Sequence, residues 1–252
     1  MILYKCLIGN FPIIPEEHYF DPNIEYVFFH THPIENKHGK WNFINIPISD
    51  NPIQDQRKYK ILSHELFNSP SIYVDFNYLL KPGSFNTIKS LLDKNSFNVA
   101  EHPFRKTYLD ELCDWMFCCS DDKETTTITR YLRYLGYDFN QHFCPLGGFL
   151  IRDTSNKTKQ INNYWWNIWN KFKKRDQLFL PPSVFFTKHN INLFNFDDLF
   201  DFCGQQNNNN LYLPKFFQHK NNSASIPSLV NKINYITNRK DIFNTGIIKH
   251  RI

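Results

Sequence analysis

The stretch SIYVDFN at residues 71–77 combines a short β-prone run with an acidic residue directly after it. Ser71–Val74 predicts a buried strand that ends at Asp75. Because ligands of open α/β sheets bind at the carboxyl ends of parallel strands, we expect Asp75 at a binding edge. Asn77 offers a second oxygen two residues later, and such oxygens suit Mg²⁺ or Mn²⁺ bound to a diphosphate. A D-x-N triplet alone could equally cap a turn, so its neighbours decide the interpretation.

On both sides of this stretch, runs with strand periodicity alternate with runs of helical periodicity. Strands are predicted at residues 2–8, 25–29, 41–46, 97–100 and 147–152. Helices are predicted at residues 57–67, 84–92, 108–119, 126–135 and 161–172, with Ser84 as an N-cap. Pro181-Pro182 is expected to end an element. The alternation predicts an α/β fold, a Rossmann-like, mainly parallel twisted sheet flanked by helices in a single domain.

The composition fits a packed domain and excludes several classes of protein. Of 252 residues, 41% are hydrophobic and 17% aromatic, which is enough for a core. The net charge of +5 comes without a dense basic stripe, so no nucleic-acid partner is expected. A modest positive field suits a diphosphate ligand and leaves a peripheral contact with an anionic membrane surface open. No run approaches the roughly 20 apolar residues of a membrane span, and no signal peptide is visible. The six cysteines form no C-x-x-C motif. We therefore expect reduced thiols and a cytoplasmic protein.

Four segments, in this order, resemble the motifs of a known family. They are RKYKILSHELF followed by SIYVDFN from residue 57, EHPFRKTYLDE from residue 101, GFLIR from residue 148, and the segment from Trp165 that ends in KRDQL at residue 178. The match covers approximately residues 1–190 and resembles a GT-A-type glycosyltransferase family, first catalogued as a domain of unknown function, with plant mucilage-related, bacterial capsule and large-virus members. Three positions depart from the family pattern. This chain has Leu109 where the family has a Tyr, Leu146 or Gly147 where it has a Glu, and His30-Thr31-His32 where it has an Asp-Asn pair.

The resemblance implies a GT-A-like fold and a glycosyltransferase of the hexosyl- or deoxyhexosyltransferase class, as used in polysaccharide biosynthesis. The donor would be a nucleotide-diphosphate sugar such as a UDP-sugar, bound with Mn²⁺ or Mg²⁺, and the acceptor a glycan or a lipid-linked sugar. Residues 1–220 would form the domain, with a nucleotide-binding half at about 1–100 and an acceptor half at 101–220. Residues 221–252 would form a polar helix or tail. The donor sugar, the acceptor, the stereochemical outcome and the oligomeric state do not follow from the sequence.

Residues of the donor site are expected on both sides of the strand at 71–74. Ile8, Gly9 and Asn10 end the first predicted strand and should border the base and the ribose. Arg57 and Lys60 should approach the diphosphate, while Asp75 and Asn77 meet the metal.

Two later segments are further candidates for the donor site. The resemblance implies that His219 returns to the metal and that Lys220 offsets charge on the diphosphate, although an exposed histidine in an Asn-rich loop is an equal alternative. His102 precedes a Pro-stiffened turn, and Arg105 after it suits a bidentate hold on a phosphate. Arg105 and Glu111 could equally form a structural pair, with His102 as a polar core residue.

The catalytic candidates are Arg175 and Asp176, just after an aromatic helix. As a general base, Asp176 would remove the proton of the acceptor hydroxyl during attack on the anomeric carbon. Arg175 would keep that carboxylate ionised. The alternative is a helix-terminal salt bridge. In a retaining enzyme Asp176 would instead orient the sugar or the acceptor.

Two other classes of protein remain as alternatives. His30-Thr31-His32 ends a strand with H-x-H, as in metal-dependent hydrolases, but such a site needs further ligands at later strand ends. A non-catalytic carbohydrate-binding protein could use the many aromatic residues and would not depend on metal or nucleotide.

Overall fold

In the computed structural model, the strand at residues 71–74 lies in the middle of a seven-stranded sheet of order β3-β2-β1-β4-β7-β6-β8. The structure describes residues 1–9, 15, 19–32, 39–119 and 122–202. The strands are β1 (Ile2–Leu7), β2 (Glu25–His30), β3 (Trp41–Asn45), β4 (Ser71–Val74), β6 (Phe97–Glu101), β7 (Pro145–Arg152) and β8 (Asn192–Phe194).

The sheet is mainly parallel. Strands β1 to β4 pair in parallel, β6 and β8 also pair in parallel, and β7 lies antiparallel between β4 and β6. Helices flank the sheet in one domain. The predicted fold class, an α/β fold with a Rossmann-like, mainly parallel sheet flanked by helices, is therefore confirmed.

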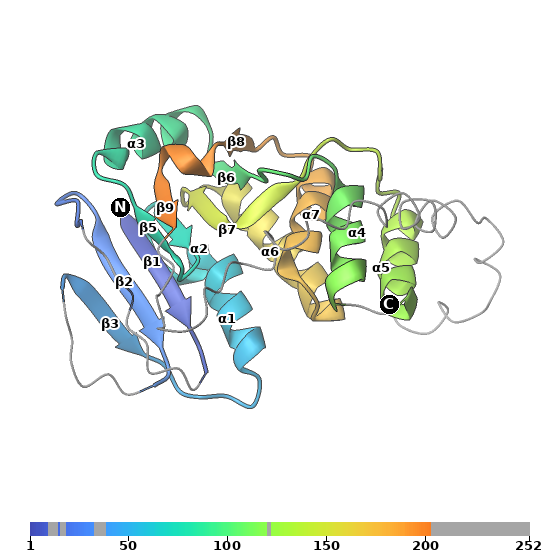
Figure 1. Cartoon of the computed structure of the whole chain (residues 1–252), viewed down its shortest axis with the longest axis horizontal. Helices are drawn as coiled ribbons and strands as arrows, with labels where there is room; N and C mark the ends of the chain where they lie inside the picture. The colour runs from blue at the N-terminus through green and yellow to red at the C-terminus, as the bar shows by residue number, and fades with distance from the viewer. Residues whose placement is uncertain (10–14, 16–18, 33–38, 120–121, 203–252) are drawn as a thin grey trace.

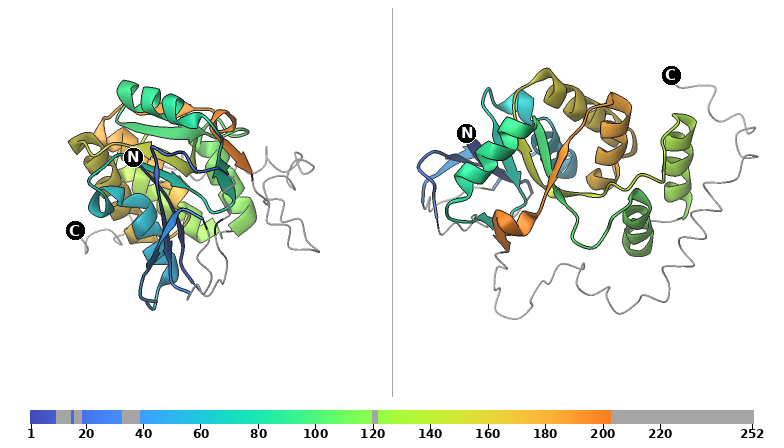
Figure 2. Two further views of the ribbon diagram at one scale, coloured as in Figure 1. Left: turned by 90° about the vertical axis from the view of Figure 1, so that its left-hand side faces the viewer. Right: turned by 90° about the horizontal axis from the view of Figure 1, so that it is seen from above.

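Helices and a small second sheet cover the two faces (Figures 1 and 2). One face carries the helices α1 (Pro52–Ile61), α2 (Ser63–Leu66), α6 (Asn156–Phe172) and α7 (Leu180–Thr187). The other carries α3 (Ser84–Lys94), a two-stranded antiparallel sheet of β5 (Tyr78–Leu80) and β9 (Phe200–Phe202), and the 3₁₀ turn η2 (Phe196–Asp198). Helices α4 (Tyr108–Cys119) and α5 (Asp122–Tyr134) lie at the end of the molecule opposite β3 (Figure 1).

Alternation along the strands builds two cores, one on each face of the sheet. In β1, Tyr4 belongs to the core under α1 and α6, whereas its neighbour Leu3 belongs to the core under α3. In β4, Tyr73 and Ile72 divide in the same way. This period of two is what a strand covered on both faces requires. Each large apolar side chain buried in these cores stabilises the fold by about 1.5–3 kcal/mol.

The direction of the strands decides where a ligand can bind. The parallel strands end at one common edge, and Asp75 and His102 come directly after β4 and β6 there. Because β7 runs the other way, its beginning lies at that same edge: the backbone N–H of Asp75 donates to the carbonyl of Gly148, 2.9 Å away. The chain therefore gathers segments from distant parts of the sequence at one edge.

Most predicted elements form, and the following details differ from prediction. The helix predicted at 57–67 is two helices, because Leu62 leaves the helical conformation (φ −91°, ψ 45°) between α1 and α2. Gly83, with a left-handed φ of 79°, takes the N-cap position predicted for Ser84. Pro181 and Pro182 lie in the first turn of α7 and begin a helix, where their missing N–H groups cost nothing.

Some sequence predictions fall on residues outside this description. The tail predicted at 221–252, the end of the predicted domain, Asn10, His219 and Lys220 all lie outside the described residues. In the part of the chain that the structure does describe, no helix is both long and apolar enough to cross a membrane.

Candidate active site

Asp75 stands at the carboxyl end of β4 and is held there by its own strand. The Tyr73 hydroxyl, two residues earlier on the same side of the strand, donates to Asp75 Oδ1 at 2.9 Å. Tyr73 itself is 1% exposed, whereas the side chain of Asp75 is 46% exposed. A fixed carboxylate therefore faces outward from the edge of the sheet. Asn77 lies in the turn that follows and is exposed.

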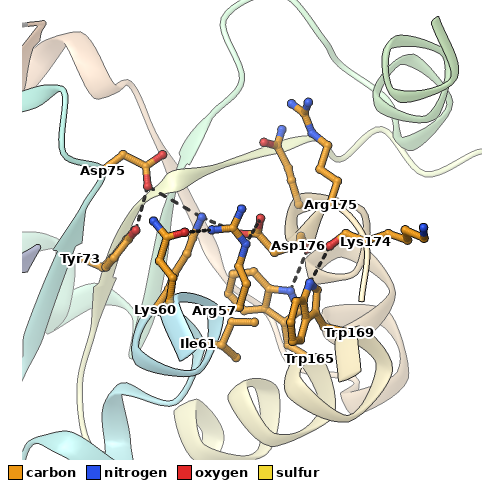
Figure 3. Close-up of polar contacts among 12 residues, drawn as sticks. Arg57, Lys60, Ile61, Tyr73, Asp75, Trp165, Trp169, Lys174, Arg175 and Asp176 are labelled. Atoms are coloured by element: carbon orange, nitrogen blue, oxygen red, sulfur yellow. Dashed lines mark hydrogen bonds and ion pairs between the residues drawn. The ribbon is translucent and has the colours of Figure 1, made fainter. Parts of the chain in front are cut away.

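A buried ion cluster lies beside Asp75 (Figure 3). Lys60 Nζ, from the end of α1, is 2.6 Å from Asp176 Oδ2 and 4.0 Å from Asp75 Oδ1. Arg57, one turn earlier on α1, places Nε 2.9 Å from Asp176 Oδ1. Thus Lys60 lies between two carboxylates, and both oxygens of Asp176 face cations.

The cluster fixes the charge of Asp176. Burial alone would raise the pKa of this carboxyl, but the positive charges of Arg57 and Lys60 outweigh burial and hold the pKa well below its usual range. Asp176 in turn raises the pKa of the Arg57 guanidinium. The site therefore contains a buried carboxylate that is paired with two basic side chains from one helix.

Two glycines at the start of β7 leave room around these carboxylates. A Cβ on Gly148 would lie 2.6 Å from Asp75 Oδ2, closer than real side-chain atoms approach. A Cβ on Gly147 would lie 3.6 Å from Lys60 Nζ and 3.8 Å from Asp176 Oδ2, which is ordinary contact. Gly148 is therefore needed for the observed position of Asp75, whereas Gly147 keeps the space next to the ion cluster open.

The segment that carries Asp176 is the 3₁₀ turn η1 (Asp176–Leu178) and the residues before it. The indole N–H of Trp165 donates to the Asp176 carbonyl at 2.9 Å, and that of Trp169 donates to the Lys174 carbonyl at 2.6 Å. Arg175 turns away from Asp176 (Figure 3) and places Nε 2.6 Å from Glu111 Oε1. Arg57 and Lys60, more than the predicted Arg175, hold Asp176 ionised.

His102 and Arg105 form a second cluster with α4. Arg105 pairs with the buried carboxylate of Glu111 and, at 3.0 Å, with Asp114. The structural pair considered from the sequence, Arg105 with Glu111, therefore exists. His102 Nδ1 accepts the backbone N–H of Arg105 at 3.0 Å, and burial together with the charge of Arg105 lowers its pKa to about 2. His102 is neutral, and a role of either residue in donor binding stays a prediction.

The end of β1 is closed by a loop contact. The Gly9 backbone N–H donates to Thr31 Oγ1 at 2.9 Å, and that hydroxyl donates to the Gly9 carbonyl at 2.7 Å. Ile8 is 6% exposed and packs in the core, so only its backbone can border a ligand. Contact of Ile8 and Gly9 with a base or ribose stays a prediction.

The residues at the edge fit a divalent metal that arrives with a diphosphate. Among the described residues, no group of three or more His, Cys, Asp or Glu side chains could hold a metal by itself. Asp75 and Asn77 supply two hard oxygen donors, one of them half-exposed and aligned by Tyr73. Mg²⁺ and similar ions are commonly held by one or two carboxylates plus substrate phosphates and water. The donor set therefore suits a metal–diphosphate complex better than a resident metal.

Sequence reasoning overlooked two kinds of residue in this site. Tyr73 could have been found, because it precedes Asp75 by two positions and must share its face of the strand. Trp165 and Trp169 lie in the helix predicted at residues 161–172, but the carbonyls that their indole N–H groups contact come from the chain after α6. A buried tryptophan N–H needs such a partner, although its identity requires the tertiary structure.

Comparison with known proteins adds two solved structures of similar shape. The first is the galactosyltransferase LgtC in complex with donor and acceptor sugar analogues, with 12% identity, a TM-score of 0.44, and 77% of this chain and 73% of that chain covered. The second is an active-site mutant of LgtC, with 11% identity, a TM-score of 0.46 and the same coverage. No protein-family model matches the sequence, and no curated protein is significantly similar to it. Likeness at this level identifies neither a reaction nor a substrate.

Proposed function

We propose that the protein is a glycosyltransferase that moves a sugar, of the hexose or deoxyhexose class, from a nucleotide-diphosphate donor to a hydroxyl of a glycan or lipid-linked acceptor. The observation that carries this proposal is the grouping of Asp75, Lys60, Arg57 and Asp176 at the carboxyl edge of the sheet. An outward carboxylate next to two cations suits a metal-bound diphosphate, and a second, buried carboxylate beside them suits the reacting sugar.

On the donor side, Asp75 and Asn77 would hold Mn²⁺ or Mg²⁺, with His219 as a further proposed ligand. When bound, the metal neutralises charge on the diphosphate leaving group. Lys60 Nζ already lies between Asp75 and Asp176, so a small movement would bring it to a phosphate oxygen. Arg57 offers a second cation at the same place, and Lys220 is proposed to add a third.

On the acceptor side, Asp176 is proposed to take the proton of the attacking hydroxyl if the reaction inverts the anomeric centre. A carboxylate with both oxygens paired and a lowered pKa is a weak base. A bound diphosphate would draw Lys60 and Arg57 toward itself and leave Asp176 more basic. The base is therefore proposed to become effective only once the donor is in place. If the reaction retains configuration, Asp176 orients the sugar instead.

The test is thermal unfolding of the protein with a panel of nucleotide sugars and free nucleoside diphosphates, each with and without Mn²⁺. A ligand at 100 times its Kd stabilises the native state by about 2.7 kcal/mol. For a chain of this size, that corresponds to a rise in Tm of roughly 5–10 °C. We expect such a rise for at least one nucleotide sugar with Mn²⁺, and loss of the metal-dependent part in Asp75→Ala. Stabilisation by metal alone, with no nucleotide effect, would contradict the proposal.

The two alternatives gain little support. His30 is 6% exposed, its Nδ1 lies 2.8 Å from the His32 carbonyl, and its ring stacks on Phe28. No group of three metal-ligating side chains surrounds the pair within the described residues, so a hydrolase site there lacks ligands. A carbohydrate-binding protein without catalysis would bind sugar equally well after Asp176→Asn, whereas the proposed enzyme would lose transfer.

A further inference from the structure

We infer that Glu111, on α4, is a positioning residue that sets the geometry of the Asp176 segment during sugar transfer. This inference rests on the proposed function. Glu111 is not one of the proposed donor ligands, and its side chain is 1% exposed. It cannot reach solvent, and its role must act through the side chains that it contacts.

Glu111 binds both neighbours of Asp176. Arg175 Nε lies 2.6 Å from Oε1, and the Gln177 side-chain amide donates to Oε2 at 3.0 Å. Arg175 and Gln177 are the residues directly before and after Asp176. One carboxylate therefore holds the two side chains that flank the proposed catalytic residue, and it does so from an element separated from Gln177 by 66 positions in sequence.

The main chain of the segment that carries Asp176 is held by a different helix, α6. Trp165 and Trp169 on α6 donate to the carbonyls of Asp176 and Lys174 (Figure 3). Helix α6 thus holds the backbone of the segment and α4 holds the side chains on both sides of Asp176, while Asp176 itself contacts Lys60. Removal of the α4 half would leave two backbone hydrogen bonds from α6 but release both flanking side chains, so that the segment and Asp176 with it could shift.

The charges around Glu111 make this contact strong. Burial raises the pKa of Glu111, and the guanidinium groups of Arg175 and Arg105 oppose that effect. Burial of a carboxylate is unfavourable unless cations and hydrogen bonds surround it, and an apolar pair of equal volume would stabilise the fold as well. The ionic arrangement is therefore better explained by the fixed geometry that it imposes than by stability.

Asp114 provides a matched control on the same helix. It lies one turn after Glu111, contacts the same two arginines at 3.0 Å and 3.9 Å, and is 27% exposed. Asp114→Asn removes the same charge from the same cluster as Glu111→Gln does, but leaves the hydrogen bond to Gln177 intact.

The experiment compares Glu111→Gln with Asp114→Asn in the full chain, using the nucleotide sugar and Mn²⁺ identified by thermal shift. Calorimetric titration with the nucleoside diphosphate gives the Kd and the fraction of protein that binds, and rates are divided by that fraction. For Glu111→Gln we expect an unchanged Kd and a kcat lower by roughly 10- to 100-fold, since a displacement of about 1 Å can cost that much. For Asp114→Asn we expect a kcat within about threefold of wild type, as for a partly exposed ion pair.

A second variant covers the case in which Glu111→Gln does not fold. Glu111→Asp keeps the charge between the arginines but withdraws it by one methylene from Arg175 and Gln177, and should show the same loss of kcat with unchanged Kd. Equal kcat in the Glu111 and Asp114 variants, or a kcat of Glu111→Asp close to wild type, would overturn the positioning role. Failure of the proposed function is distinguishable, because the wild-type protein would then transfer no sugar at all.

Discussion

At the scale of single residues, Asp176 combines two properties that are rarely compatible in a proton acceptor. It is 4% exposed, which disfavours its charge, and it lies between Lys60 and Arg57, which stabilise that charge more strongly. Such a carboxylate stays ionised but has little affinity for a proton while the cations remain. In the proposed reaction its basicity would therefore depend on what else binds Lys60 and Arg57, and the diphosphate of the donor would compete for them.

Asp176→Asn and Asp75→Ala should have different effects on the proposed reaction. Asp176→Asn removes the proton acceptor and should lower the rate of transfer by roughly 10²–10⁴-fold. Nucleotide affinity should not fall, because Lys60 and Arg57 lose a competitor for the phosphates. Asp75→Ala should weaken metal-dependent nucleotide binding itself. Transfer rates with saturating donor, together with calorimetric Kd values in Mn²⁺, separate the two effects.

Near-normal transfer by folded Asp176→Asn protein would remove the base assignment, although the donor site could stand without it. Wild-type nucleotide affinity in Asp75→Ala, measured with and without Mn²⁺, would instead remove the metal site. Asp93→Asn serves as a control for the loss of one negative charge. Asp93 is exposed and lies on α3, outside the proposed metal site and the Asp176 cluster.

The sequence was informative for residues whose roles depend on near neighbours. Asp75 follows from its own strand, and Arg57 and Lys60 follow from a segment that immediately precedes that strand. The partner of Arg175 was not predictable, because Glu111 lies on α4, far earlier in the sequence, and meets Arg175 only in the folded chain. A motif such as RDQ supplies residue types in order, whereas the tertiary structure decides that Arg175 faces Glu111 and Asp176 faces Lys60.

At the scale of elements, β7 links the fold to the site. It is the antiparallel strand of the large sheet, and its first residues lie beside the carboxyl end of β4. A strand running parallel to β4 would place its other end there. The antiparallel direction of β7 therefore brings Gly147 and Gly148 against Asp75 and Lys60.

Gly148→Ala should displace the Asp75 carboxylate and leave the fold intact. The added Cβ would lie 2.6 Å from Asp75 Oδ2, and that oxygen is the end of a half-exposed side chain that can rotate away. Loss of one charged ligand contact costs about 1.5–3 kcal/mol, so metal-dependent nucleotide affinity should fall roughly ten- to a hundredfold. Calorimetric titration in Mn²⁺ measures this directly.

Gly147→Ala is the matched control for that substitution on the same strand. Its Cβ would make only ordinary contacts, with no atom closer than 3.6 Å, and would leave Asp75 in place. Metal-dependent nucleotide binding should therefore stay close to wild type in Gly147→Ala. Equal losses in the two variants would show that the position of Asp75 is not what Gly148 protects.

Elements with a clear pattern of residue types were predictable, and the three-residue strands were not. Helix α4 and strand β4 agree with their predicted bounds, because apolar periodicity and β propensity act over the whole element. Strands β5, β8 and β9, of three residues each, were overlooked because so short a run carries no period. The break at Leu62 was also invisible, since the apolar positions on both sides of it continue at helical spacing.

At the scale of the whole molecule, the alternation of strands and helices predicted a mainly parallel sheet. A helix between two strands returns the chain to the edge of the sheet where the first strand began, so the second strand runs parallel to the first. The order of the strands was not predictable in that way. Strand β7 lies between β4 and β6, and Arg152 stands at its end. This buried guanidinium donates to the Lys60 and Ile61 carbonyls at 2.9 Å and 3.0 Å, and so joins β7 to the end of α1.

The stability of the whole domain should depend on the charge of Asp176 in acid. Its pKa in the folded protein is well below the value of about 3.9 for an unfolded chain. A group with a depressed folded pKa stabilises the native state fully above its unfolded pKa, and this contribution is lost as the pH falls toward the folded pKa. The wild-type protein should therefore lose stability below about pH 4, while Asp176→Asn, already less stable at neutral pH, lacks this component.

Urea midpoints of the wild type, Asp176→Asn and Asp93→Asn between about pH 2.5 and pH 7 test this dependence of stability on pH. The gap between wild type and Asp176→Asn should narrow as the pH falls, because acid removes from the wild type the same charge that the substitution has removed. Parallel curves for these two proteins would show that the buried ion cluster does not hold Asp176 ionised.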